Sequence, residues 1–299
     1  MDNPKVNIVE VGPRDGLQNE TTSIATETKL ELIQRLAGAG LKTIEATAFV
    51  SPKRIPQMAD NQAVMAGLDL NADIRYPVLV PNLQGLEAAI EAGAKEIAIF
   101  TATSDSFTQK NIQCTVAESI QRFIPVINEC LRHNIAIRGY LSTVIDCPYE
   151  GPITPARTAD IAQQLLDLGC YQISLGDTIG TGTPERVKRM LVTVQKNIPA
   201  KLLAGHFHDT YGMGIANIYA AWQMGITTFD ASVGGLGGCP YAPGASGNVA
   251  TEDVLWLMQG LGVETGVDLD QIVQTALWIS HQLGRPLGSK TGRARAITE

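Results

Sequence analysis

The stretch Leu202-Leu203-Ala204-Gly205-His206-Phe207-His208-Asp209 joins an apolar run to two histidines that are two residues apart. If it forms a β-strand, the two-residue period places both imidazoles on one face and Phe207 on the other. The chain has only four histidines, so half of them stand where this strand would end. Two imidazoles that converge from one strand supply half of a metal site. The alternative is two unrelated histidines in a half-buried strand, but their shared position favours the metal site.

Short apolar strands alternate with helical segments on both sides of this stretch. We expect strands over residues 6–11, 43–48, 75–80, 96–101, 135–143, 171–175, 201–208 and 228–233. We expect helices over residues 28–38, 83–92, 115–132, 154–168, 183–196, 214–224, 249–260 and 269–283, the last being an additional C-terminal helix. This alternation is typical of an α/β fold of the (β/α)8 TIM-barrel type. An open doubly wound sheet is the alternative, but no Gly-x-Gly-x-x-Gly motif follows the first strand and no P-loop is present.

Residues that satisfy free backbone groups mark the helix boundaries. The start signals are the capping-box pairs Thr28–Glu31 and Thr115–Glu118 and the N-cap pairs Thr154-Pro155 and Thr183-Pro184. The end signals are the glycines Gly40, Gly93, Gly169 and Gly225, which recur at every second unit. We therefore expect residues 1–299 to form one barrel domain. The polar tail 285–299 is expected either to be poorly ordered or to cover one face of the barrel.

Composition excludes several classes of protein. The net charge of −7 and the absence of a basic run argue against nucleic acid as a partner. No stretch approaches the 18 or so consecutive apolar residues that a membrane span needs, so no membrane partner is expected. The five scattered cysteines suit reduced thiols better than a disulfide framework, and the first ten residues lack a signal core. We therefore expect a cytoplasmic protein.

Polar residues gather where the expected strands end, which in a barrel is the face that carries the chemistry. They are Arg14 and Asp15 after strand 1, Glu45 late in strand 2, Asp177 after strand 6, His206 and His208 at the end of strand 7, and Cys239 and Asn248 after strand 8. Each has a structural alternative: Arg14-Asp15-Gly16 is an ordinary turn sequence, and Asp177 or Asn248 can cap a turn or a helix. Cys239 can be an inert buried thiol, but its glycine-rich approach favours a loop over a site. Cys147 shares the tripeptide Cys-Pro-Tyr with Cys239, and the glycines favour the latter.

Together these residues suit one reaction type. Asp15, His206, His208 and Asn248 offer two nitrogens and two oxygens, a set that suits Mg²⁺ or Mn²⁺ better than Zn²⁺. Such an ion can chelate a pair of substrate oxygens and make a hydroxyl acidic. Arg14 can hold a developing oxyanion, and a cysteine on a loop can exchange a proton with carbon. The residues therefore point to making or breaking a carbon–carbon bond next to a carbonyl.

The chain resembles the 3-hydroxy-3-methylglutaryl-CoA lyase family, which is part of a metal-dependent lyase and condensing-enzyme superfamily of (β/α)8 barrels. The resemblance extends over residues 6–283. The shared motifs are VGPRDGLQN (11–19), FVSPK (49–53), SLGDT (174–178), HFHDTYG (206–212) and GLGGCPY (235–241). The last is the most specific, because the isopropylmalate and homocitrate synthases of the superfamily are expected to lack it.

The resemblance implies a role for each matching residue. Asp15, His206, His208 and Asn248 correspond to ligands of Mg²⁺ or Mn²⁺, Arg14 to the group that stabilises an enolate, and Cys239 to a catalytic thiol. Glu45 and Asp177 correspond to acidic residues that support the site. The residues expected to contact substrate are Arg14, Gln18, Asn111, Tyr140 and Thr178. Lys53, Arg54, Lys110 and Asn111 lie in rim loops and are candidates for the nucleotide end of CoA.

The implied reaction is cleavage of 3-hydroxy-3-methylglutaryl-CoA to acetyl-CoA and acetoacetate, with Asp15 or His206 as the base and an acyl-CoA as the small-molecule partner. The resemblance also implies a homo-oligomer, either a dimer or a tetramer. Two alternatives stay open: an acyl-CoA condensing enzyme of the superfamily, and a non-catalytic metal-binding relative. The cysteine motif disfavours the first, and the complete set of site residues disfavours the second.

Overall fold

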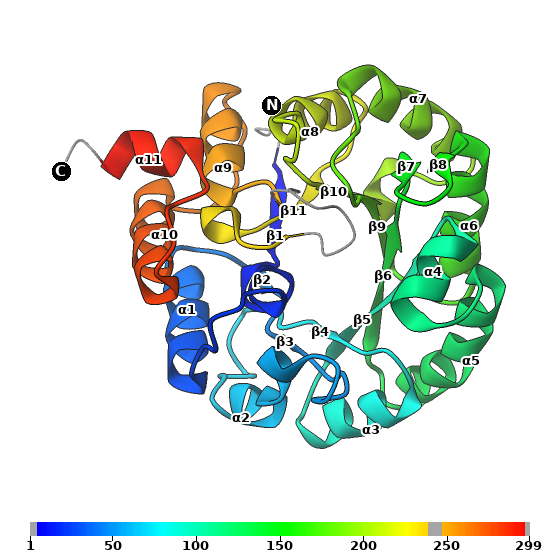
Figure 1. Ribbon diagram of the computed structural model, residues 1–299, viewed down its shortest axis with the longest axis horizontal. Helices are drawn as coiled ribbons and strands as arrows, with labels where there is room; N and C mark the ends of the chain where they lie inside the picture. The colour runs from blue at the N-terminus through cyan, green and yellow to red at the C-terminus, as the bar shows by residue number, and fades with distance from the viewer. Residues whose placement is uncertain (1–4, 239–246, 297–299) are drawn as a thin grey trace.

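A ring of parallel strands forms the centre of the molecule, and helices surround it (Figure 1). The computed structural model describes residues 5–238 and 247–296. The strands are β1 (Asn7–Glu10), β2 (Thr43–Ile44), β3 (Thr47–Ala48), β4 (Val78–Leu79), β5 (Glu96–Ala102), β6 (Ala136–Ser142), β9 (Gln172–Asp177), β10 (Leu203–Phe207) and β11 (Thr228–Ala231). Their order is β2-β1-β11-β10-β9-β6-β5-β4-β3, and every adjacent pair is parallel. The barrel-type α/β fold is confirmed.

The ring closes at a break within the second expected strand. β2 pairs with β1 and β3 pairs with β4, so residues 43–48 join the two edges of the sheet. The amide of Glu45 donates to the carbonyl of Glu10 over 2.8 Å, whereas the amides of Ile44 and Ala46 donate to the carbonyls of Arg75 and Pro77 over 3.0 Å. Successive amides thus bond to opposite neighbours, and closure leaves this sheet without free edges.

One helix of the outer layer follows each barrel strand, except that β2 leads directly into β3 and the two share one helix. These helices are α1 (Thr26–Gly38), α2 (Asn61–Ala66), α3 (Leu83–Glu91), α5 (Val116–Arg132), α6 (Pro155–Asp167), α7 (Pro184–Val194), α8 (Gly214–Gln223) and α9 (Thr251–Gly260). Outside this set lie α4 (Asp105–Ile112), α10 (Leu269–Leu283), α11 (Lys290–Ala296) and the small hairpin β7 (Asp146–Cys147) and β8 (Gly151–Pro152). Within the described residues, no helix has the length and apolar character that crossing a membrane requires.

The boundary signals were right in some places and wrong in others. Thr115 and Glu118 form the expected capping box, and the Thr154 side chain accepts a hydrogen bond from the Arg157 amide. The capping box expected at Thr28 was wrong, because α1 already begins at Thr26 after an N-cap, Ala25, whose side chain cannot accept a hydrogen bond. The four end-signal glycines all have positive φ, between 82° and 114°, which explains why glycine recurs there.

Three helices were not foreseen: α2, α4 and α11. α2 has only 6 residues and α4 has 8, so neither is long enough to show a clear apolar period. α11 belongs to the polar tail, and its position depends on distant partners. Asp253 accepts a hydrogen bond from the Thr291 amide over 2.6 Å, and Lys290 forms an ion pair with Asp209 over 3.0 Å. α11 therefore packs beside α9 and α10 at the outer edge of the barrel (Figure 1).

One continuous cluster of buried apolar side chains joins the barrel strands to the inner faces of the helices. Leu36 on α1 is fully buried in it, whereas Leu131 on α5 is 64% exposed. The two leucines therefore form a matched pair for testing the packing of the helix layer.

We predict that Leu36→Ala lowers the free energy of unfolding by about 2–5 kcal/mol, because it removes buried methyl groups and leaves a cavity. Leu131→Ala is expected to change the free energy of unfolding by less than about 0.5 kcal/mol. Urea denaturation followed by circular dichroism measures both. Equal losses in the two variants would contradict the described packing of α1.

Candidate active site

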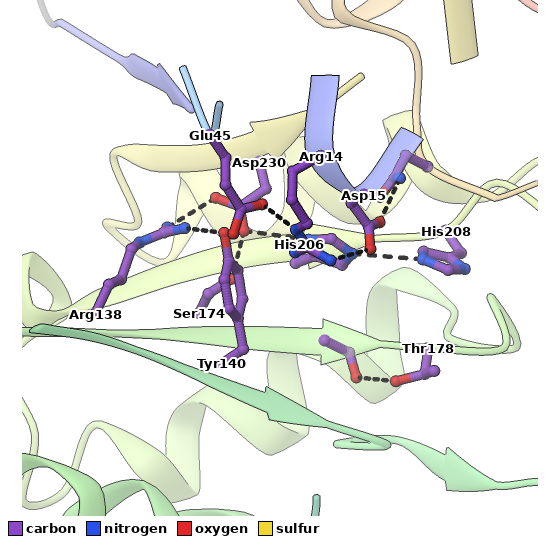
Figure 2. A network of polar contacts seen from close by, with 12 residues as sticks. Arg14, Asp15, Glu45, Arg138, Tyr140, Ser174, Thr178, His206, His208 and Asp230 are labelled. Atoms are coloured by element: carbon purple, nitrogen blue, oxygen red, sulfur yellow. Dashed lines mark hydrogen bonds and ion pairs between the residues drawn. The ribbon is translucent and has the colours of Figure 1, made fainter. Parts of the chain in front are cut away.

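Three side chains of types that can bind a metal ion meet at the carboxyl ends of β1 and β10. Asp15 lies in the short helical turn η1 (Gly12–Gly16) that follows β1, His206 lies in β10, and His208 follows directly. A carboxylate oxygen of Asp15 and one ring nitrogen of each histidine all lie within 4.8 Å of one another. The two Nε2 atoms of the histidines are 3.4 Å apart (Figure 2). The two-residue period of the strand has therefore brought both imidazoles to one place, as the sequence predicts.

Asn248 lies beside this group and is held there by its backbone and its side chain. It forms an isolated antiparallel bridge with His208, and its Nδ2 donates to Asp15 Oδ2 over 2.8 Å and to the carbonyl of Leu236 over 3.3 Å. The structure thus brings together all four residues expected to bind the cation. In this arrangement the amide of Asn248 presents its nitrogen to Asp15, so coordination through its oxygen would require the amide to turn.

Arg14 lies beside Asp15 with its guanidinium between two carboxylates. Its Nη1 donates to Asp15 Oδ1 over 2.7 Å, and its Nε lies 2.8 Å from Glu45 Oε2. The guanidinium also stacks over the ring of Tyr140, 5.6 Å from the ring centre. Glu45 is fully buried and stands at the break that closes the barrel. The same break therefore closes the sheet and places the Glu45 carboxyl group beside Arg14 (Figure 2).

A second buried ion pair supports His206 from inside the barrel. Asp230, in β11, accepts a hydrogen bond from Arg138 Nη2 over 2.7 Å and one from Ser174 Oγ over 2.6 Å. Its Oδ2 also lies 3.1 Å from His206 Nδ1 (Figure 2). A carboxylate at Nδ1 fixes the tautomer that leaves Nε2 free to bind a cation. Sequence reasoning missed Arg138 and Asp230, and the available signal was a charged residue inside each of two expected apolar strands.

The charges in this network set the protonation states of the site. Burial alone would raise the pKa of Asp230, but Arg138 and the hydrogen bond to His206 outweigh it and hold the pKa below its usual value. Burial would likewise raise the pKa of Asp15, but the charge of Arg14 and that of His206 lower it. Burial, reinforced by His206, lowers the pKa of His208 to about 4. His208 is therefore neutral at pH 7, which is the form that binds metals.

A cavity of about 570 Å³ opens beside these residues, a volume typical of small-molecule sites. Arg14, Asp15, His206 and His208 line it together with the apolar side chains of Val50, Leu79, Phe100 and Phe123. Two arginines, Arg54 and Arg122, line it from the segments that follow β3 and β5. The cavity therefore combines a cluster of polar side chains, apolar walls and positive charge.

The other expected site residues divide into three groups. The four expected substrate contacts besides Arg14 line the cavity: Gln18, Asn111, Tyr140 and Thr178. Gln18 Oε1 is buried and has no hydrogen-bond partner among the described residues. Asp177 is not among the lining residues, because its carboxylate turns to accept a hydrogen bond from the Gly182 amide over 2.8 Å. Cys239 lies outside the described residues.

Two further expectations concern residues near the site. Cys147, the alternative thiol, is buried 2.9 Å from the Ser104 hydroxyl and does not line the cavity. Lys53 and Lys110 do not line it either, whereas Arg54 does. Geometry thus separates Arg54 from the two neighbouring lysines, which sequence alone had left equivalent.

Comparison with known proteins shows a consistent likeness. A family model described as HMGL-like matches residues 5–279. The chain is 52% identical to mitochondrial hydroxymethylglutaryl-CoA lyase from Gallus gallus, with 97% of each chain covered. It is also 52% identical to the cytoplasmic 3-hydroxy-3-methylglutaryl-CoA lyase of Rattus norvegicus, with 97% of this chain and 84% of the relative covered.

Solved structures give the same result. Hydroxymethylglutaryl-CoA lyase from Pseudomonas aeruginosa superposes with a TM-score of 0.97 at 49% identity, over 100% of both chains. An HMG-CoA lyase from Acinetobacter baumannii, in complex with coenzyme A and 3-methylmalate, superposes with a TM-score of 0.93 at 38% identity, over 97% of this chain and 95% of that one.

The buried pair Arg138–Asp230 generates a prediction about stability. Arg138→Met should lower the free energy of unfolding by about 3–5 kcal/mol, because it leaves the Asp230 carboxylate buried without its cation. Arg186→Met is the matched control, since Arg186 pairs with Asp146 but keeps 35% of its side chain exposed, and its loss should be about 1 kcal/mol. Urea denaturation measures both. A smaller loss for Arg138 than for Arg186 would contradict the central role of the buried pair.

Proposed function

The chain belongs to the HMGL-like family, and on that premise we propose that the cavity at the carboxyl ends of the strands is where it cleaves 3-hydroxy-3-methylglutaryl-CoA. The protein is a carbon–carbon lyase, a hydroxymethylglutaryl-CoA lyase by its likeness to relatives and solved structures. The products are acetyl-CoA and acetoacetate. One observation carries the assignment of the reaction to this cavity: Arg14 and Asp15 converge there with His206 and His208, which lie far away in the sequence.

The residues present fit a divalent cation. Two ring nitrogens face each other at 3.4 Å with a carboxylate oxygen nearby, and burial keeps His208 neutral. Asp15, His206, His208 and Asn248 would hold the ion, and this mixed nitrogen and oxygen set favours Mg²⁺ or Mn²⁺. When bound, the cation would bind the hydroxyl and carboxylate oxygens of the substrate and increase the acidity of the hydroxyl.

The reaction begins with removal of the proton from the tertiary hydroxyl of the substrate. Two groups that line the cavity can take this proton, the Asp15 carboxylate and the His206 imidazole. Asp15 is held ionised by Arg14, and His206 is oriented by Asp230. Both groups lie where the substrate hydroxyl would be bound. His206 could act as the base only through an Nε2 that does not hold the cation, because its Nδ1 faces Asp230.

Loss of the hydroxyl proton allows the carbon–carbon bond to break. The electron pair of the new ketone comes from the former O–H bond, and the pair of the broken carbon–carbon bond passes to the thioester fragment as an enolate. The Arg14 guanidinium, fixed by Glu45 and Asp15, faces the cavity and stabilises the enolate oxygen. The Cys239 thiol returns a proton to the enolate carbon, which completes acetyl-CoA.

The rest of the cavity suits the CoA portion of the substrate. The apolar walls formed by Val50, Leu79, Phe100 and Phe123 can accept the pantetheine chain, and Arg54 and Arg122 can pair with phosphates. Arg54 is held in place by a hydrogen bond to Gln113 Oε1 over 3.0 Å. The likeness to an HMG-CoA lyase solved with coenzyme A supports this placement. Gln18, Asn111, Tyr140 and Thr178 would contact the acyl portion or the chain beside it.

Three wider features complete the proposal. Residues 1–299 would act as a single catalytic domain. The protein would reside in the cytoplasm, in keeping with four unpaired cysteines among the described residues and with the cytoplasmic relative from Rattus norvegicus. It would form a homo-oligomer, a dimer or a tetramer, an expectation that rests on the family resemblance.

We predict that purified protein releases acetoacetate from 3-hydroxy-3-methylglutaryl-CoA, that a chelator abolishes this release, and that Mg²⁺ or Mn²⁺ restores it. Cys239→Ala should lower kcat by a factor of about 10² to 10⁴, because the enolate then lacks its proton donor. Acetoacetate is measured by its enzymatic reduction coupled to NADH oxidation.

Cys147→Ala is the matched control, because Cys147 stands in the same tripeptide but its thiol does not line the cavity. It should keep the wild-type kcat. A folded, cation-loaded protein that releases no acetoacetate would refute the proposed function.

The placement of CoA generates a separate prediction. Arg54→Ala should raise KM by about 10-fold with little change in kcat, because it removes a phosphate contact that is equal in ground and transition states. Lys53→Ala is the control, since this neighbouring cation does not line the cavity, and its KM should stay at the wild-type value. Steady-state kinetics at saturating cation measures both. Equal KM values for the two variants would exclude Arg54 from the CoA site.

A further inference from the structure

Glu10, the last residue of β1, is fully buried and joins three separate segments of the chain. Its Oε1 accepts hydrogen bonds from the Gly12 amide over 2.8 Å and from the Val233 amide over 2.9 Å. Its Oε2 accepts a hydrogen bond from the Thr251 hydroxyl over 2.6 Å. One carboxyl group therefore accepts hydrogen bonds from two backbone amides and one hydroxyl group. The three donors come from the first and the last parts of the barrel sequence.

Two of these segments lead directly to a residue of the cation site, and the third leads to Leu236, whose carbonyl accepts a hydrogen bond from Asn248. Gly12 begins η1, the turn that carries Arg14 and Asp15. Val233 begins η4 (Val233–Gly235), the turn that leads to the glycine-rich segment before Cys239. Thr251 begins α9, three residues after Asn248. Glu10 itself does not line the cavity, so it cannot act on the substrate directly.

The same segments also pack tightly against one another next to the cation site. A Cβ atom placed on Gly16 would stand only 2.8 Å from Ser232 Oγ and 2.8 Å from Leu236 Cβ. Asn248 bridges Asp15 and the carbonyl of Leu236. Asp15 and Asn248 therefore meet only while η1, η4 and the start of α9 keep their relative positions, and Glu10 is the side chain that bonds to all three.

We propose that Glu10 is a positioning residue that sets the distance between the Asp15 and Asn248 halves of the cation site by holding η1, η4 and the start of α9 together. The inference rests on the proposed cation site. It extends that proposal to a side chain outside the cavity.

The contacts of Glu10 indicate that the length of its side chain matters more for positioning than its charge. All three partners are neutral donors, and burial raises the pKa of Glu10 to about 7 despite the hydrogen bonds that favour its ionised form. A glutamine in this position keeps an acceptor for the Gly12 and Val233 amides, and its own amide can donate to the Thr251 hydroxyl. An aspartate keeps the carboxylate but is one methylene shorter, so it cannot reach all three donors.

Three variants separate these effects: Glu10→Gln, Glu10→Asp and Thr251→Val. The measurements are the dissociation constant of Mn²⁺ by electron paramagnetic resonance, kcat and KM for acetoacetate release, and the temperature of thermal unfolding. Glu10→Gln should keep the wild-type Mn²⁺ affinity and kcat. Glu10→Asp should weaken Mn²⁺ binding by about 10-fold and lower kcat in parallel. Thr251→Val, which removes one hydrogen bond only, should weaken Mn²⁺ binding by about fivefold.

Glu96→Asp is the matched control for loss of a buried carboxylate contact. Glu96 is 5% exposed and pairs with Arg75 at the start of β5, at the opposite ends of the strands. The substitution should lower the unfolding temperature but leave the Mn²⁺ affinity unchanged. If Glu10→Asp behaves in the same way, or if Thr251→Val binds Mn²⁺ with wild-type affinity, Glu10 serves stability alone and the proposal is overturned. If Glu10→Asp binds Mn²⁺ more tightly than Glu10→Gln, the proposal is also overturned, because the charge of the side chain rather than its length would then matter.

The wild-type protein separates this test from that of the proposed function. Mn²⁺ binding and acetoacetate release by the wild type test the cation site, whereas the ratios of variant to wild-type values test Glu10. If the wild type binds Mn²⁺ and releases acetoacetate but the variants do not differ from it, only the proposed role of Glu10 is refuted. A wild type that binds no Mn²⁺ refutes both.

Discussion

The rest of the molecule depends on the pairing of residues 43–48 with both edges of the sheet, because this pairing closes the sheet into a ring. The hydrogen bond from the Glu45 amide to the Glu10 carbonyl belongs to it. Closure brings the carboxyl ends of all the barrel strands to one face. Asp15 and Asn248, which are 233 positions apart in sequence, can then form a hydrogen bond over 2.8 Å. Both residues of the closing contact also use their side chains, since Glu45 pairs with Arg14 and Glu10 holds the turns next to the cation site. Fold and site therefore share the same residues.

Buried charge is the main cost of this arrangement, and the structure offsets it by pairing. Arg138 and Asp230 are both buried and pair directly, and Arg14 stands between Asp15 and Glu45. A buried ion pair adds little net stability, but removing one partner is costly, so such pairs enforce one geometry. Here that geometry orients the His206 ring and the Arg14 guanidinium. Because these groups are already held in place, the site needs little rearrangement before reaction.

Sequence reasoning predicted what depends on local pattern. The alternation of strands and helices, the capping box at Thr115 and the convergence of His206 and His208 follow from periods and spacings, and the structure has them. It failed where a long-range partner decides the outcome. α11 depends on Asp253, and the break at Glu45 depends on the closure of the ring. Arg138 and Asp230 were missed because neither spacing nor composition shows that two buried charges on different strands face each other.

Burial produces two kinds of supporting carboxyl group around the site, and the difference lies in their partners. Asp230 pairs with Arg138, so its pKa falls and it stays ionised. An ionised carboxylate suits a group that accepts a hydrogen bond from His206 Nδ1. Glu10 and Glu252 are held by neutral amide and hydroxyl donors, and burial raises their pKa values to about 7 and about 8. These two accept hydrogen bonds from the backbone amides of Val233 and Gly234. Glu45 combines both features, because burial raises its pKa although the Nε of Arg14 lies 2.8 Å from its Oε2. The balance between burial and pairing, rather than the presence of a cation alone, therefore sets the pKa of each buried acid here.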